Sequence, residues 1–216
     1  PMVVRIPLGA KTRSGPFHAN MIESWFLNDP GLVIVFPSNP QDAYDLLVEA
    51  AALPDPVVYL EHLGMYGLRG GMTGWGDRIH MQVDTESVAK SIESGDTYKL
   101  GKANVVRGGS DGTIVTWGAM VHVCEQAIKD SGVSCDLIDL QTLVPWDRDA
   151  IIKSIEKTGR CVIVHEAPKT SGFGAEMAAS IQERCFYHLE SPIERVTGWD
   201  TPFPHTTEWD YMPGPS

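Results

Sequence analysis

The sequence contains TIVTWG at 113–118, CDLIDL at 135–140 and CVIVHEA at 161–167, three short apolar runs rich in β-branched residues. Continuous apolar runs of this length are typical of parallel strands that are covered on both faces. Apolar residues recur at helical spacing in the two intervals between the runs, at 119–130 and 147–157. This alternation of strand and helix predicts a doubly wound α/β domain with right-handed crossovers.

The alternation extends on both sides of these runs. A short strand, NVVR, precedes them at 104–107, and a helix at 172–187 and a strand at 193–198 follow. We therefore expect one complete α/β domain over residues 101–216.

The first 62 residues contain a second, shorter alternation. It consists of strand, helix, strand, helix and strand, at 2–6, 19–28, 32–36, 39–53 and 56–61. Asn39-Pro40 is a typical helix start, because the Asn side chain can accept early backbone N–H groups and Pro needs no donor there. These elements predict a fragment of a parallel sheet whose strands need further neighbours.

Residues 63–100 differ in character from both alternating parts. Six glycines fall between Gly64 and Gly76, and a polar stretch ends at Asp96. We interpret this segment as a connection between two domains, with a short helix at 85–92.

Composition excludes several classes of protein. Seventeen basic and 28 acidic side chains give a net charge of −11, which argues against nucleic acid or an anionic membrane as partner. The four cysteines have no spacing typical of a metal site and indicate buried thiols in a reducing compartment. No apolar stretch is long enough to cross a membrane. The chain starts inside a strand-like run, so we expect the natural protein to begin upstream.

Polar residues follow the predicted strands at the edge where open parallel sheets carry their sites. His165-Glu166 could act as an acid/base pair. Adjacent residues in a strand point to opposite faces, which favours a structural role instead. The glycines of Gly172–Glu176 open a helix and could hold a phosphate, but close packing of the helix on a strand explains them equally well.

His18 lies in the turn Gly15-Pro16-Phe17-His18 between a strand and a helix. A side chain at such a turn can project into a cleft and act on a substrate. A helix-capping or surface histidine is the alternative, and position alone does not decide between them.

Five long segments together resemble the beta subunits of 2-oxoacid dehydrogenases, the decarboxylating components of the pyruvate and branched-chain complexes. The resemblance is carried by RIPLGAKTRSGPFHANMIESWFLNDPGLVIVFPSNPQDAYDLL, GKANVVRGGSDGTIVTWGAMVHV, GVSCDLIDLQTLVPWD, KTGRCVIVHEAPKTSGFGAEMAASIQE and RVTGWDTPFPHTTE. It implies that residues 1–62 are the C-terminal part of a thiamine pyrimidine-binding domain and that 101–216 form a transketolase C-terminal-type domain. The motifs GVSC, VPWD, HEAP and DTPFPH resemble the branched-chain subclass.

The resemblance implies a catalytic role for His18, which matches the histidine of the family motif GPxHSQ, although Ala19 and Asn20 depart from it. The implied reaction is decarboxylation of a 2-oxoacid on thiamine diphosphate, followed by transfer of the acyl group to a lipoyl group. The alternatives are a pyruvate or acetoin dehydrogenase subunit, or a non-catalytic module for subunit pairing and assembly.

The resemblance also implies cofactors and partners. Thiamine diphosphate and magnesium would be shared with an alpha subunit in an α2β2 heterotetramer, and a glutamate that activates the cofactor would lie upstream of Pro1. No cofactor-binding residue is assigned in this chain. A lipoyl acyltransferase core, carrying a basic docking domain, would be a further partner. The implied location is the bacterial cytoplasm or the mitochondrial matrix.

A structural potassium ion is the last implied group. Its site matches Ala50, Ala51, Leu53 and Asp55, where Leu53-Pro54-Asp55 replaces more polar family residues. Gln141 likewise replaces the arginine usual in the family motif IDLRT.

Overall fold

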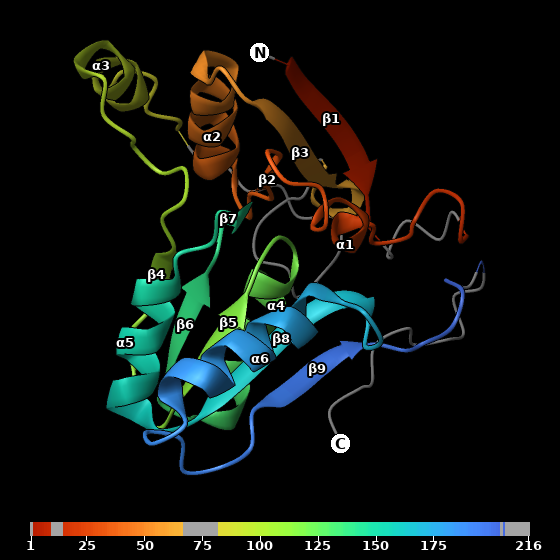
Figure 1. The fold of residues 1–216 in the computed structure, drawn as a ribbon, viewed down its shortest axis with the longest axis vertical. Helices are drawn as coiled ribbons and strands as arrows, with labels where there is room; N and C mark the ends of the chain where they lie inside the picture. Colours follow the sequence, from red (N-terminus) through yellow and green to blue (C-terminus); the bar gives the residue numbers. More distant parts are fainter. Residues whose placement is uncertain (1, 10–14, 67–81, 204, 206–216) are drawn as a thin grey trace.

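The computed structural model describes residues 2–9, 15–66, 82–203 and 205. The chain forms two sheets that meet at the carboxyl ends of their parallel strands (Figure 1). Within these residues, no helix combines the length and apolar character needed to cross a membrane.

The first sheet has the strand order β1-β3-β2-β7. β1 and β2 both run parallel to β3, as expected, because a helical segment connects each strand to the next. The elements of this part are β1 (Met2–Leu8), α1 (Glu23–Phe26), β2 (Val33–Val35), α2 (Pro40–Ala52), β3 (Pro56–His62) and the 3-10 turn η2 (Leu63–Met65).

The second sheet has the order β4-β6-β5-β8-β9, with β4 antiparallel at one edge and the other strands parallel. The predicted doubly wound architecture is confirmed. Its elements are β4 (Asn104–Arg107), β5 (Gly112–Thr116), α4 (Met120–Ser131), β6 (Cys135–Asp139), α5 (Arg148–Thr158), β8 (Cys161–Pro168), α6 (Phe173–Cys185) and β9 (Glu194–Gly198).

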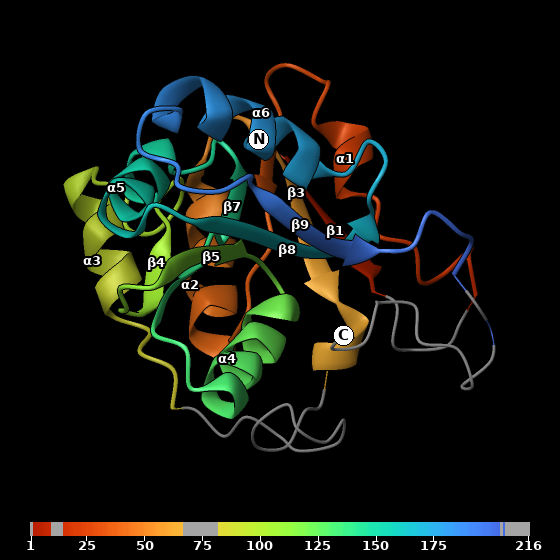
Figure 2. The same ribbon diagram turned by 90° about the horizontal axis from the view of Figure 1, so that it is seen from below.

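Helices cover both faces of the second sheet (Figures 1 and 2). α5 and α6 bury Ile151, Ile155 and Met177 in the main apolar core, while α4 packs Val121 and Ile128 on the opposite face. Burial on both faces explains why the strands are apolar throughout.

Two sequence expectations need correction. The chain supplies an additional strand for the first sheet itself: β7 (Thr142–Val144) leaves the end of β6 and pairs antiparallel with β2. The helix expected at 19–28 is only α1, because Ala19 and Met21 are buried in a non-helical segment before it. Tertiary packing of these two side chains overrides the helical period of the sequence.

The connection between the two sheets contains the expected short helix, α3 (Ser87–Ser94). It contacts α2. Glu49 on α2 holds the stretch that follows, since its carboxylate accepts the backbone N–H groups of Tyr98 at 2.6 Å, Lys99 at 2.8 Å and Leu100 at 3.0 Å. Most of the glycine-rich part of the connection lies outside the described residues.

Candidate functional site

The candidate site is the seam, which we define as the region where the strand ends of the two sheets meet. β3 ends at His62 on one side, and β5 and β6 end near Trp117 and Asp139 on the other. The arrowheads of β1 and β3 face those of β5 and β6 in Figure 1. Open parallel sheets carry their chemistry beyond these ends.

The turn that carries His18 lies between β1 and α1. The carbonyl oxygen of Gly15 accepts the N–H groups of His18 at 3.3 Å and Ala19 at 3.1 Å, which closes the turn. Gly15 has a φ of 72°, a conformation that favours glycine. His18 is exposed, so its imidazole can reach a group outside the chain, but no described contact assigns its role.

His165 and Glu166 point to opposite faces of β8, as expected. The His165 ring is fully buried and stacks on Trp117 with 5.3 Å between ring centroids. Burial lowers the pKa of His165 to about 4, so the ring is neutral at physiological pH. A neutral ring stacked in the core is structural.

The glycines at the start of α6 make room for this ring. A Cβ on Gly174 would lie 2.6 Å from Nε2 of His165, and one on Gly172 would lie 2.5 Å from the carbonyl oxygen of Pro168. Close packing of helix on strand therefore accounts for both glycines, without a bound phosphate.

Glu166 reaches across the seam to a partner that sequence reasoning missed. Its Oε2 lies 2.7 Å from Nε2 of His62, with both side chains buried. Glu23 on α1 is also fully buried, and among the described residues neither of its carboxylate oxygens has a hydrogen-bond partner. Burial raises the pKa of Glu23 to about 7, and the nearby charge of Glu166 acts in the same direction. Glu23 lies within the first resembling segment but outside its GPFHAN motif, and His62 lies outside all five segments, so no sequence signal singled out either residue.

A polar network joins the two sheets at a second point of the seam. Ser38, just after β2, donates its hydroxyl to the buried carboxylate of Asp139 at the end of β6. Gln141 donates its side-chain amide to Asp42 at 3.1 Å, and Asp42 also pairs with Lys99. Burial raises the pKa of Asp139 to about 7. Gln141, noted in the sequence as a departure from the family, therefore has a structural role.

The residues matched to a potassium site lie together at the end of α2. Ala50 is buried, Leu53 is half-buried, and Ala51 and Asp55 are exposed. The N–H group of Leu53 donates to the carbonyl oxygen of Ala50 at 3.4 Å. Elsewhere, no group of three or more His, Cys, Asp or Glu side chains in the described part of the chain is arranged to hold a metal ion.

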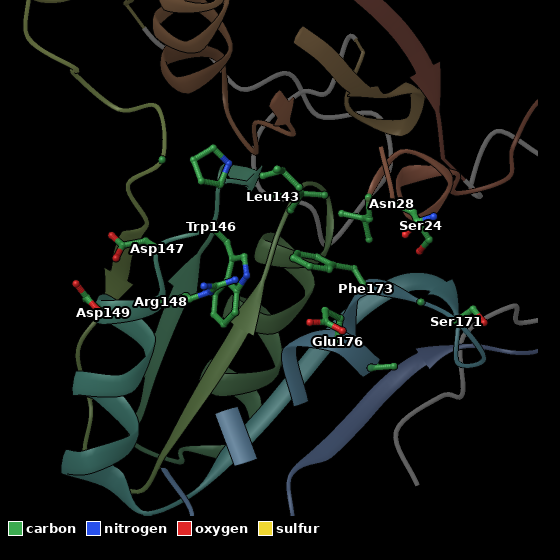
Figure 3. A pocket seen from close by; sticks show the side chains of 16 residues that line it. Ser24, Asn28, Leu143, Trp146, Asp147, Arg148, Asp149, Ser171, Phe173 and Glu176 are labelled. Carbon is green, nitrogen blue, oxygen red and sulfur yellow. The ribbon is translucent and has the colours of Figure 1, made fainter. Parts of the chain in front are cut away.

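An open pocket of about 1040 Å³ lies between α1, the segment after β7 and the start of α6 (Figure 3). Trp146 and Phe173 form its apolar wall, with ring centroids 6.5 Å apart. The guanidinium carbon of Arg148 lies 5.2 Å from the centre of the Trp146 ring, and Glu176 lies on the other side of the pocket in Figure 3. His18 does not line this pocket.

Residues 101–216 match the family described as the transketolase C-terminal domain. The chain belongs to this family. The matched region begins just before β4 and contains the whole second sheet.

The family resemblance inferred from the sequence is confirmed by similarity to named relatives. The chain is 44% identical to 2-oxoisovalerate dehydrogenase subunit beta of Pseudomonas aeruginosa over all of its residues and 61% of that protein. It is 43% identical to the mitochondrial subunit of the same name in Dictyostelium discoideum, over 98% of this chain and 54% of the relative. Pyruvate dehydrogenase E1 component subunit beta of Bacillus subtilis is 38% identical over 94% of this chain and 58% of that protein. The chain thus spans a little over half the length of these relatives.

A solved structure supports the fold independently. The chain is similar to a split gene transketolase, described as an inactive beta4 tetramer, with a TM-score of 0.63 and 17% identity. The likeness covers 92% of this chain and 56% of that one. The structural similarity therefore extends over both sheets of this chain.

Proposed function

We propose that the chain is part of the beta subunit of a thiamine-diphosphate-dependent 2-oxoacid dehydrogenase of the branched-chain type. The observation that carries the proposal is similarity over the whole chain, and so over both sheets, to proteins named 2-oxoisovalerate dehydrogenase subunit beta. Identity to the pyruvate relative is lower, at 38% against 44%, which favours a branched-chain 2-oxoacid as substrate.

Within this proposal the first sheet belongs to a pyrimidine-binding domain and residues 63–100 connect it to the C-terminal domain. The geometry supports such a division. The strand ends of both parts meet at the seam, and the side chain of His18 is exposed. A bound thiamine diphosphate supplies the electron sink for loss of carbon dioxide. His18 holds and transfers a proton at one of its ring nitrogens.

The remaining ligands and partners are proposed on the same basis. Magnesium and the diphosphate group would be held mainly by an alpha subunit in an α2β2 assembly, and the acyl group would pass to a lipoyl acyltransferase. A potassium ion at the end of α2 is proposed on the resemblance alone, since the carbonyl oxygen of Ala50 there already accepts the N–H of Leu53 at 3.4 Å. The assembly would operate in the bacterial cytoplasm or the mitochondrial matrix.

The experiment is reconstitution of the full-length beta subunit with its alpha subunit and thiamine diphosphate. We expect decarboxylation of 2-oxoisovalerate, and a loss of roughly 100-fold or more in kcat for His18→Ala, as for removal of a general acid or base. His188→Ala is the control, because this histidine is 48% exposed and lies on the second domain. An unchanged rate for His18→Ala would refute its catalytic role, and preference for pyruvate or acetoin would refute the substrate class.

A non-catalytic role in subunit pairing is the second candidate. It is favoured by large apolar side chains that stay exposed on the second domain, including Val105 on the edge strand β4, Phe186, Tyr187 and Trp199. Sedimentation of the full-length beta subunit with and without the alpha subunit tests it. An assembly that forms but decarboxylates no 2-oxoacid would favour this candidate over the catalytic one.

A further inference from the structure

The segment after β9 crosses from the second sheet to the turn that carries His18. β9 ends at Gly198, and in both Figures 1 and 2 the chain that follows runs beside the loop containing residues 15–19. The two segments are almost 200 residues apart in the sequence. A contact over this separation is a feature of the tertiary fold.

Asp200 anchors the beginning of this segment to the second domain. Its carboxylate accepts the backbone N–H of Thr170 at 2.9 Å and the hydroxyl of Thr170 at 2.7 Å. These two bonds to the loop after β8 hold the pKa of Asp200 below its usual value. The segment therefore leaves the sheet from a fixed point.

Phe203 forms the first contact with the turn. It is 6% exposed and forms a small apolar cluster with Ala19, which is 1% exposed. Ala19 is the residue next to His18, and its N–H closes the turn by bonding to Gly15. Burial of the phenylalanine ring thus fixes one end of the turn.

His205 forms the second contact, at the other end. A Cβ built on Gly15 would lie 1.9 Å from Cε1 of the His205 ring, so the ring lies directly against the Gly15 backbone. Gly15 is required here for two independent reasons, the contact with His205 and its φ of 72°. Both residues that flank the exposed part of the turn are therefore in contact with the same segment.

We propose that Phe203 and His205 are positioning residues for His18. Phe17, between the two contacts, is 92% exposed and contributes no packing of its own. The orientation of the His18 side chain then depends on the contacts of Ala19 and Gly15 with the second domain. The functional consequence rests on the proposed catalytic role of His18, whereas the positioning itself does not.

The kinetic test uses the reconstituted assembly with full-length beta subunit. We expect Phe203→Ala to lower kcat by up to about 100-fold while KM changes little, because a displacement of about 1 Å of a catalytic group has an effect of this size. Phe203→Leu should restore most of the loss by refilling the contact with Ala19. Val133→Ala is the control for Phe203→Ala, because Val133 is an exposed apolar residue of the same domain, and His188→Ala is the control for His205→Ala.

The structural test does not depend on turnover. In the same assembly, hydrogen exchange at the Ala19 amide should be at least about tenfold faster in Phe203→Ala than in Val133→Ala, because an opened contact exposes the bond to Gly15. The imidazole NMR signal of His18 should also shift in Phe203→Ala and in His205→Ala. Unchanged exchange and an unchanged His18 signal would overturn the proposal, even if His18 is catalytic. If His18→Ala retains full activity, the proposed function fails, while exchange and NMR still decide the positioning.

Discussion

Oε2 of Glu166, on β8, lies 2.7 Å from Nε2 of His62, the last residue of β3. This contact joins the ends of two strands that belong to different sheets. Both side chains are almost fully buried, at 3% and 1% exposure, so water cannot replace either partner. The pair is therefore a fixed connection across the seam.

Removal of one member should destabilise the chain strongly. We expect Glu166→Ala or His62→Ala to lower the free energy of unfolding by about 3–5 kcal/mol, because the remaining polar group stays buried without its partner. The double variant should lose clearly less than the sum of the two, as measured by urea denaturation. Lys90→Ala is the control. Its exposed pair with Glu86 on α3 should contribute no more than about 0.5 kcal/mol. Additive losses at the seam would mean that the two residues do not interact.

Stability should fall as the pH rises from the ordinary carboxyl pKa to about 7. Glu23 and Asp139 are buried and their pKa values are raised to about 7, above the usual values of the unfolded chain. Their contribution to stability is thus complete at pH values below the ordinary carboxyl pKa and is lost as the pH rises to about 7. Glu23 faces Glu166 and His62, while Asp139 faces Asp42.

Urea unfolding at about pH 5 and about pH 8.5 measures this effect. Glu23→Gln and Asp139→Asn should each make the loss of stability between the two pH values smaller, since an amide does not ionise. A pH dependence identical to that of the wild type in both variants would contradict the assignment of the titrating groups.

A methyl group at Gly174 should disturb the buried His165 ring. Ala favours a helix over Gly by about 1 kcal/mol, but the Cβ would lie 2.6 Å from Nε2 of His165. We expect Gly174→Ala to destabilise by roughly 1–3 kcal/mol, the usual range for overpacking. In a His165→Ala background the same change should become neutral or stabilising, because the ring is absent. Thermal unfolding of the wild type and the three variants in this cycle measures the coupling.

Lys99 should be essential for the polar network that ties the connection to α2. Its Nζ pairs with Asp42 and with Asp45 at 2.9 Å, and both carboxylates are buried. Lys99→Met should therefore destabilise by about 3 kcal/mol, since two buried carboxylates would face each other without that cation. Lys90→Met, on an exposed face of α3, is the matched control for denaturation experiments. If Lys99→Met lowered the free energy of unfolding as little as Lys90→Met, the two buried carboxylates would not depend on the Lys99 cation.

Part of the candidate site could be predicted from the sequence. Side chains alternate along a strand, which predicted that His165 and Glu166 point to opposite faces. The glycines that open α6 allow close packing of the helix on β8, which was one of the two interpretations of them. The seam contacts were not predictable. His62 and Glu166 are 104 residues apart, and neither periodicity nor spacing indicates which strand ends will meet. The roles of His18 and of Ala50, Ala51, Leu53 and Asp55 remain predictions.

The sequence by itself determined the order of strands and helices, because apolar periodicity is a local property that each segment carries in its own residues. It therefore identified the doubly wound second sheet and the parallel arrangement of the first three strands. Only the tertiary structure decided that β7 crosses to pair with β2, that α1 is short, and that Phe203 and His205 lie on the turn of His18. Each of these depends on a contact between distant segments, where burial against a partner outweighs local propensity.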